Sequence, residues 1–201
     1  LFEKGDLRFL GFYPSKKRVQ DFALFFIVTA ICCATGFFLK MLIAKQHWVI
    51  NPDISAPVIL KGVWFNIKSV LFEELIFRGV LLYILIKKLG DTKAIIISAA
   101  AFGVYHWFSH ELFGNTQAMI IEFIVTGAMG LVLAYAYSKT YSLYIPIAIH
   151  LGWGIVQQTV FSDGPIGGQI FIEVMPRPVI TVSYFSFFVM LLLPVTSALL
   201  I

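Results

Sequence analysis

Residues 69–90 read SVLFEELIFRGVLLYILIKKLG, an apolar stretch of helical length that carries Glu73, Glu74 and Arg78 near its middle. One charged side chain at the centre of a membrane helix costs about 2.5 to 3.5 kcal/mol on insertion scales. Two adjacent carboxylates and a guanidinium are therefore costly at that depth unless they pair with one another or take part in chemistry. We infer that this stretch forms the centre of a functional site.

The composition of the chain is typical of a membrane protein. Among its 201 residues, 59% are hydrophobic and 13% are charged, whereas soluble domains carry about 25% charged residues. Apolar runs of about 20 residues recur along the chain, which is the length that a helix needs to cross a bilayer. We therefore predict an all-α fold, a polytopic transmembrane helical bundle of about six spans whose site lies within the membrane. The length allows a single membrane-embedded domain, residues 1–201.

The order of apolar and polar segments predicts where the spans lie. The predicted loops cover residues 46–57, 87–93, 109–117, 139–140 and 161–178, and the last is rich in glycine and proline and should be irregular. The predicted spans cover residues 21–44, 57–87, 93–108, 117–138, 141–160 and 179–201. At about 1.5 Å per residue the second span is about 45 Å long, so it should tilt or protrude. Gly127 and Gly130 are expected points of close helix packing in the fourth span, and Pro194 is the expected kink in the last.

Basic residues predict the orientation of the chain. The loops at 1–20, 87–93 and 139–140 share one side of the predicted bundle. They hold nine basic residues: Lys4, Arg8, Lys16, Lys17, Arg18, Lys87, Lys88, Lys93 and Lys139. Because basic loops remain in the cytoplasm, we predict a cytoplasmic N-terminus with residues 1–20 as a basic cytoplasmic segment. The net charge of +4 thus reflects membrane topology, and we expect the lipid bilayer and no nucleic acid as a partner.

Three polar residues on three predicted helices reach a similar depth. Counted from the basic residues at the inner ends of their helices, Glu73, His106 and His150 each lie about 16–21 Å into the membrane at about 1.5 Å per residue. Matched depth is a necessary condition for one shared site, and it is met. Whether the three side chains face one another is a question of tertiary structure.

Helix geometry separates the roles of the charged side chains. Glu74 and Arg78 are four residues apart, so they share a helix face and can form an ion pair. Glu73 points about 100° away, onto the face that carries Asn66 and Phe77. One carboxylate is thus expected to be held by the arginine, while the other is available for chemistry.

The chemistry that these groups permit is the activation of a water molecule. A carboxylate in an apolar cavity is a better proton acceptor than in water and can act as a general base. One imidazole can orient the base or the water, and a second can donate to the oxyanion of a tetrahedral intermediate. Phe102 lies four residues before His106, so its ring can pack beside the imidazole. We expect no cofactor. A divalent metal at Glu73, His106 and His150 is the lesser alternative, because the HExxH spacing is absent.

Three sequence motifs resemble those of a known family. Residues 73–78, EELIFR, match an EExxxR motif; residues 102–106, FGVYH, match FxxxH; and His150 follows SLYIPIAI, where the family has its last catalytic histidine. Together they resemble the CAAX protease and bacteriocin-processing (Abi) family of intramembrane endopeptidases, across a motif-bearing catalytic core at residues 57–160. The resemblance implies an all-helical membrane fold and a peptidase that uses a glutamate-activated water without a catalytic metal.

The resemblance also implies a substrate and a role for each matched residue. The best-known members remove three residues from prenylated CAAX proteins, so a peptide or a membrane-associated protein is the implied substrate. The small size is closer to that of prokaryotic members, and we expect an integral, multi-pass protein of a prokaryotic cell membrane. Glu73 is the implied general base. The expected catalytic residues are Glu73, Glu74, His106 and His150, and the expected supporting residues are Arg78, Phe102 and Asn66.

One position departs from the family's pattern. The last motif is usually HxxxN or HxxxD, but the fourth residue after His150 is Gly154, so the carboxamide expected near the oxyanion is missing. The alternative function is therefore a catalytically weak or inactive bacteriocin-immunity or scaffold protein. A proton-coupled transporter is a third class, against which the lack of an internal repeat counts. We expect His110 at the membrane interface and Glu122 in solvent near the outer surface.

Overall fold

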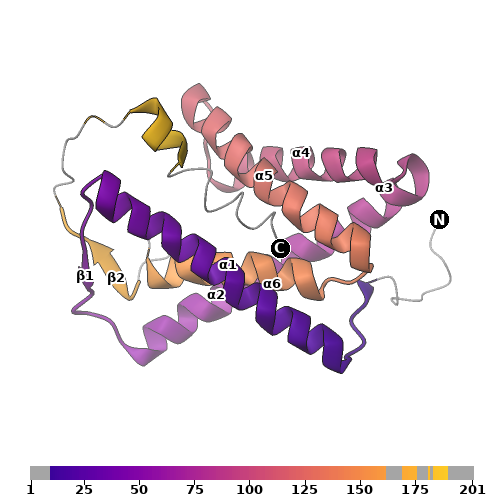
Figure 1. Cartoon of the computed structure of the whole chain (residues 1–201), viewed down its shortest axis with the longest axis horizontal. Coiled ribbons are helices and arrows are strands. Elements are labelled where there is room, and N and C mark those ends of the chain that lie inside the picture. The colour runs from indigo at the N-terminus through magenta and orange to yellow at the C-terminus, as the bar shows by residue number, and fades with distance from the viewer. Residues whose placement is uncertain (1–9, 162–168, 176–180, 182, 190–201) are drawn as a thin grey trace. The chain divides into compact units, whose positions relative to one another are not determined.

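The structure is a computed structural model that describes residues 10–161, 169–175, 181 and 183–189 (Figure 1). It is mostly helical, as the composition predicts. The helices are α1 (Lys16–Ile43), α2 (Ala56–Glu74), α3 (Leu82–Leu89), α4 (Asp91–Ser109), α5 (Thr116–Thr140) and α6 (Tyr144–Ile155), and the strands are β1 (Trp48–Ile50) and β2 (Phe171–Glu173). Residues 184–189 are also helical.

The second predicted span is one long helical run whose middle turns are wider than those of an α-helix. After α2 the chain continues as a π-helical segment, Leu75–Leu81, and then as α3. Ser98 of α4 donates a hydrogen bond to the carbonyl of Phe77 within this segment, at 3.3 Å. Gly90, with a φ of 77°, ends the run within the predicted loop at 87–93. Short π-helical segments are frequent at functional sites, and this one carries Arg78.

Helices of the structure match the bounds of the first, third, fourth and fifth predicted spans to within a few residues. α1, α4 and α5 cover the first, third and fourth, and α6 with the π-helical segment Val156–Val160 covers the fifth. The helices extend beyond the apolar runs because polar flanking residues also adopt helical backbone. The sixth predicted span and its kink at Pro194 lie outside the described residues, apart from residues 181 and 183–189.

Two predicted loops contain a small sheet instead. β1 and β2 pair in antiparallel register, with Trp48 opposite Glu173 and Ile50 opposite Phe171. The prediction of irregular structure is therefore wrong for these residues. Aromatic packing stabilises the pairing: the ring of Phe161 stacks on Phe171 at 5.1 Å and lies edge-on to Trp48 at 5.9 Å. A three-residue strand carries too little alternation of apolar and polar residues to be recognised, and the neighbouring glycines and prolines indicate a loop.

The chain separates into two compact units. The first contains Leu71–Ala148 together with the N-terminal part of the chain up to Leu24, and the second contains Phe25–Val70 together with the chain from Ile149 onward. α1, α2 and α6 each contribute residues to both units. Of the predicted site residues, the first unit holds Glu73, Glu74, Arg78, Phe102 and His106, and the second holds Asn66 and His150.

Close helix contacts build the core of the first unit, in which α4 packs along α5 and α3 packs along α4 (Figure 1). A Cβ atom on Gly130 would lie 3.0 Å from the Cα of Ala99, and one on Gly103 would lie 2.8 Å from the ring of Phe123. The predicted close packing at Gly130 is confirmed. A Cβ on Gly127 would meet Ala99 only at 4.0 Å, so Gly127 is not such a point.

The N-terminal segment and the turn after α5 lie side by side in the first unit. The N–H of Leu143 donates to the carbonyl of Leu10 at 3.0 Å, and the hydroxyl of Ser142 donates to the carbonyl of Gly11 at 3.3 Å. Leu10 and Gly11 belong to the predicted cytoplasmic segment 1–20, and Ser142 and Leu143 lie at the start of the predicted fifth span, just after the predicted loop at 139–140.

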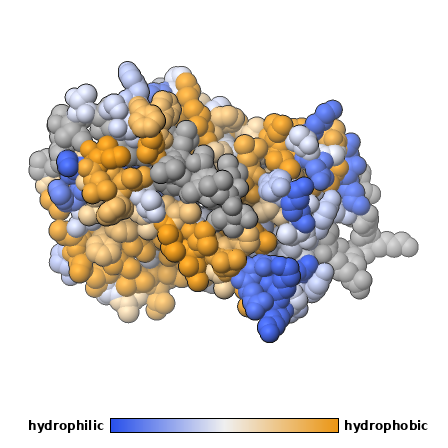
Figure 2. All heavy atoms as spheres, in the orientation of Figure 1, coloured by the Kyte–Doolittle hydropathy of each residue, from blue (hydrophilic) through white to orange (hydrophobic). Residues whose placement is uncertain are grey.

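Apolar side chains cover much of the visible surface, as the orange areas of Figure 2 show. Exposed large hydrophobic residues occur along α1, among them Ile27 and Ile31, and along α5, among them Ile120 and Ile124. Within the described part of the chain, α1 and α5 are long and apolar enough to cross a membrane. Contiguous apolar surface is unfavourable in water, whereas lipid accommodates it.

Gly130→Ala and Gly127→Ala form a matched pair that tests the contact between α4 and α5. In Gly130→Ala the new methyl group meets the backbone of Ala99, which cannot rotate away, so we expect a loss of about 1–3 kcal/mol. In Gly127→Ala the methyl group has room, and the higher helix propensity of alanine keeps this variant at least as stable as the wild type. Thermal unfolding in detergent measures both. Equal unfolding temperatures would contradict the described packing.

Candidate active site

The centre of the first unit is a fully buried ion pair between Glu74 and Arg78. Nη1 of Arg78 donates to Oε1 of Glu74 at 3.0 Å, and neither side chain has exposed surface. The pairing predicted from the four-residue spacing is confirmed. The pair joins the last residue of α2 to the π-helical segment, and so stabilises the backbone at the point where the helix changes its geometry.

Aromatic rings complete the surroundings of the guanidinium. The Cζ atom of Arg78 lies 4.1 Å from the centre of the Phe102 ring and 5.8 Å from that of Phe77, and the two rings meet edge to face at 5.2 Å. Within the described residues, Nε and Nη2 of Arg78 have no hydrogen-bond partner. Interaction of the cation with the ring of Phe102 therefore supplements the ion pair.

Glu73 is the second buried carboxylate of this centre. Its side chain lies at the end of α2, and the residue is 8% exposed. Its charge interacts with the guanidinium of Arg78, the phenol of Tyr105 and the imidazole of His106. Glu73 and His106 are therefore close enough for their charges to interact, a point that matched depth alone left open.

His106 is held in one orientation by its own helix. Nδ1 lies 2.8 Å from the carbonyl oxygen of Phe102, and the two rings pack edge to face at 4.6 Å. The predicted contact between Phe102 and His106 is confirmed. Because a carbonyl oxygen only accepts, Nδ1 carries the proton, and in the neutral imidazole Nε2 is then the proton acceptor. One phenylalanine ring therefore contacts both the imidazole and the guanidinium of Arg78.

The remaining two predicted residues lie in the second unit. His150 is half-buried on α6. Asn66 is buried on α2, and its Nδ2 donates to the carbonyl of Gly62 at 2.9 Å and to the hydroxyl of Thr159 at 3.2 Å. The expectation that His150 joins Glu73 and His106 in one site stays a prediction.

One interaction next to this centre was not predicted from the sequence. Nδ1 of His110 lies 3.1 Å from Oε1 of Glu122 on α5, and its ring packs edge to face with that of His106 at 5.3 Å. The spacing of four residues between His106 and His110 indicates the contact of their rings, because it places both on one helix face. It gives no indication of the partner Glu122 on α5. Glu122 is thus paired, whereas the sequence suggested a purely solvated carboxylate.

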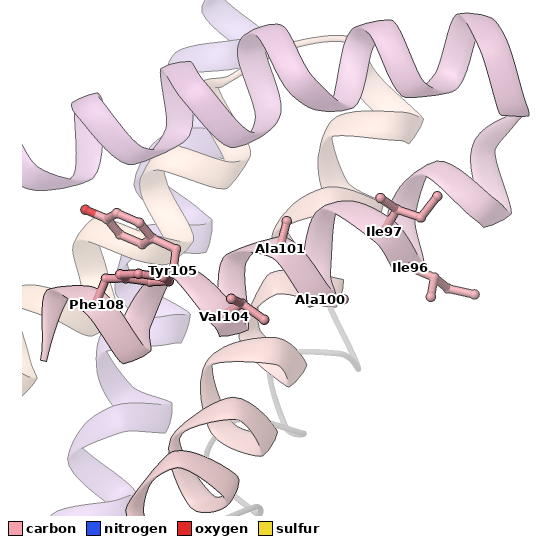
Figure 3. Close-up of a pocket in the computed structure, with 7 residues that line it drawn as sticks. All are labelled: Ile96, Ile97, Ala100, Ala101, Val104, Tyr105 and Phe108. Atoms are coloured by element: carbon pink, nitrogen blue, oxygen red, sulfur yellow. The ribbon is translucent and has the colours of Figure 1, made fainter. Parts of the chain in front are cut away.

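An open apolar groove of about 620 Å³ follows one face of α4 (Figure 3). Tyr105 and Phe108 lie at one end of it and Ile96 and Ile97 at the other. The ring of Tyr105 also contacts His106, at 5.4 Å, so the groove borders the buried centre. The lining residues are Ile96, Ile97, Ala100, Ala101, Val104, Tyr105 and Phe108.

The described residues contain no group of three or more His, Cys, Asp or Glu side chains arranged to hold a metal ion. The polar centre of the first unit instead combines two carboxylates, a guanidinium and an imidazole within aromatic walls. These groups can transfer protons and stabilise charge. Because these groups are buried among apolar helices, the protein belongs to the class of helical membrane proteins that contain a polar site in their interior.

Comparison with known proteins identifies the family. The profile described as type II CAAX prenyl endopeptidase Rce1-like matches residues 55–156, which is more than half of the chain. The chain belongs to this family, and the resemblance predicted from its motifs is confirmed. The match begins and ends within a few residues of the predicted core at 57–160. Neither the curated proteins nor the solved structures provide a match.

A double-mutant cycle tests the buried ion pair. Arg78→Met leaves the carboxylate of Glu74 buried without its cation, so we expect a loss of about 3–5 kcal/mol in the free energy of unfolding. Glu74→Leu combined with Arg78→Met removes both charges and should recover most of this loss. Unfolding in detergent by heat or denaturant gives the coupling energy. Strictly additive effects would show that the pair makes no net contribution.

The pair of His110 and Glu122 predicts a pH-dependent contribution to stability. The hydrogen bond to Glu122 raises the pKa of His110, the charges of Glu122 and Glu73 act in the same direction, and burial opposes them. A pKa raised in the folded state adds to the free energy of unfolding. This contribution is fully present below the unfolded-state pKa of about 6.5 and is lost as the pH rises through the folded-state pKa. Because His110 is half-exposed, solvent screening limits the gain to about 1 kcal/mol or less.

Glu122→Gln should therefore lower the unfolding temperature at about pH 5.5 and leave it unchanged at about pH 9. Glu111→Gln, which removes a carboxylate from the loop that follows His110, is the control and should have the same small effect at both values. A Glu122→Gln effect that does not depend on pH would refute an ionic interaction.

Proposed function

We propose that the chain is an intramembrane endopeptidase that hydrolyses a peptide bond with a water activated by Glu73. The observation that supports this most directly is the buried Glu73, which interacts with His106 beside the ion pair of Glu74 and Arg78 in the first unit. Membership of a family of CAAX prenyl endopeptidases supports the reaction class. Glu74 and His150 complete the proposed catalytic set.

In the proposed reaction Glu73 accepts a proton from water while the water oxygen attacks the carbonyl carbon of the scissile bond. A C–O bond forms, and the carbonyl electron pair moves to oxygen to give a tetrahedral oxyanion. Collapse of this intermediate breaks the C–N bond, and the proton held by Glu73 passes to the departing nitrogen. The products are a carboxylic acid and an amine, and no oxidant, reductant or cofactor is consumed.

The two histidines have different proposed tasks. His106 carries its proton on Nδ1, so its Nε2 accepts a hydrogen bond and can orient the attacking water. His150 then supplies the N–H that stabilises the oxyanion, a contribution that is large in a site from which water is excluded. Arg78 holds Glu74, and Phe102 fixes both Arg78 and His106 by its two contacts.

The environment follows from the same proposal. We place about six spans in the membrane of a prokaryotic cell, with the N-terminus and the basic loops in the cytoplasm. The bilayer covers the apolar helix surfaces, and a peptide or membrane-associated protein is the substrate. A divalent metal held by Glu73, His106 and His150 is the alternative mechanism, and it is separable by experiment.

A second candidate function rests on Gly154. If the missing side chain at this position disables turnover, the chain is a bacteriocin-immunity or scaffold protein that binds a partner without cleaving it. Protection of cells would then be equal for the wild type and for Glu73→Ala.

Cleavage of internally quenched peptides by the purified protein in detergent tests the proposal. The peptide set includes prenylated CAAX peptides, in keeping with the name of the family. We expect Glu73→Gln to lower kcat by about 10²–10⁴-fold, which is the usual contribution of a general base. Glu111→Gln, an exposed carboxylate outside the site, is the matched control and should retain the wild-type rate.

The same assay with a metal chelator separates the two mechanisms. Cleavage that depends on Glu73 and survives the chelator supports the glutamate mechanism, whereas loss in both favours the metal alternative. Unchanged cleavage by Glu73→Gln refutes the assignment of the base. Absence of cleavage by the wild type over the whole peptide set favours the binding function.

A further inference from the structure

A buried carboxamide in the second unit occupies space beside α6. Asn66 of α2 is 2% exposed, and its side chain lies against Gly154. A Cβ atom on Gly154 would be only 2.8 Å from Oδ1 of Asn66. A contact of that length is essentially never seen for a real Cβ, so a side chain at residue 154 would require Oδ1 of Asn66 to shift.

The orientation of this carboxamide follows from its partners. One of them is the carbonyl oxygen of Gly62, at 2.9 Å, and a carbonyl oxygen can only accept. The atom that faces Gly62 must therefore be Nδ2, which also donates to Thr159 at 3.2 Å. Both amide hydrogens are thus engaged. The acceptor oxygen Oδ1 is left facing α6 at Gly154.

The face of α6 that receives this oxygen is the one that carries His150. Residues 150 and 154 are four apart in one helix, so they are neighbours on its surface. A helical side chain leans toward the N-terminus of its helix, so a side chain at 154 would lie over the turn that contains residue 150. In this chain the carboxamide of Asn66 fills that space.

We propose that Asn66 is the positioning residue for His150, and that it replaces, from α2, the side chain that α6 lacks at Gly154. Oδ1 of Asn66 accepts a hydrogen bond from one N–H of the protonated imidazole and thereby fixes the ring, so that the second N–H is directed at the oxyanion. The carboxamide has moved from one helix to its neighbour while its place in space is retained. This inference rests on the proposed function, because it gives His150 a task in peptide hydrolysis.

The proposal also changes how Gly154 is interpreted. The absence of a side chain at this position leaves room for the carboxamide of Asn66, and it does not indicate a loss of activity. A side chain at 154 requires Oδ1 to shift, and a shift of the carboxamide disturbs its hydrogen bonds to Gly62 and Thr159. Gly154→Asn alone is therefore expected to be impaired, although it restores the family's usual residue at that position.

Exchange of the two residues tests the proposal. Asn66→Ala should lower kcat by about tenfold with little change in KM, which corresponds to the loss of one neutral hydrogen bond. Asn66→Ala combined with Gly154→Asn should recover most of the wild-type kcat, because the new carboxamide enters the vacated space. Asn51→Ala removes another carboxamide of the second unit, which bonds the backbone of Gln169, and should retain full activity.

A purely structural role for Asn66 gives a different pattern. The carboxamide introduced by Gly154→Asn cannot restore the hydrogen bonds to Gly62 and Thr159, so the double variant would then remain as impaired as Asn66→Ala. That result, or wild-type kcat in Asn66→Ala, would overturn the proposal. Unfolding temperatures of all variants in detergent separate loss of activity from loss of folded protein.

A measurement that needs no turnover separates this inference from the proposed function. The ¹⁵N chemical shifts of the His150 imidazole report the protonation and hydrogen bonding of its two nitrogens, and His150→Gln identifies its signals among those of the four histidines. We expect Asn66→Ala to change these shifts, the exchanged double variant to restore them, and Asn51→Ala to leave them unchanged. Shifts that are the same in Asn66→Ala and the wild type overturn the inference, even if Glu73 proves to be the base.

Discussion

The buried ion pair between Glu74 and Arg78 is the interaction on which the first unit depends. Two charges without exposed surface are tolerated only when their attraction and further contacts offset the loss of hydration. Here the contacts are aromatic, because the guanidinium lies on the ring of Phe102. The same ring packs against His106, so one aromatic ring of α4 contacts both the guanidinium and the imidazole.

In the second unit a neutral polar group is also buried, and it too needs partners that offset its loss of hydration. Asn66 is buried, and its amide hydrogens are used by Gly62 and Thr159. Its oxygen is accommodated because Gly154 has no side chain. The position that lacks a carboxamide in the motif is thus in contact with a carboxamide from a different helix, which a comparison of motifs position by position cannot reveal.

Much of the first unit was predictable because it depends on local spacing. The ion pair and the contact of Phe102 with His106 both follow from residues four apart on one helix, and the structure contains both. The pair of His110 and Glu122 was not predictable in the same way, because its members lie on different helices. The small sheet was missed because three-residue strands carry too little pattern.

The sequence by itself determined the mostly helical class of fold, the bounds of most helices and the family, since hydropathy, helical periodicity and short motifs are properties of neighbouring residues. Only the tertiary structure decided the wider π-helical turns around Arg78, the tautomer of His106 and the place of the Asn66 carboxamide against Gly154. Each of these depends on how closely two backbones approach or on which carbonyl meets a side chain. Such distances are set by the packing of whole helices, and local sequence does not encode them.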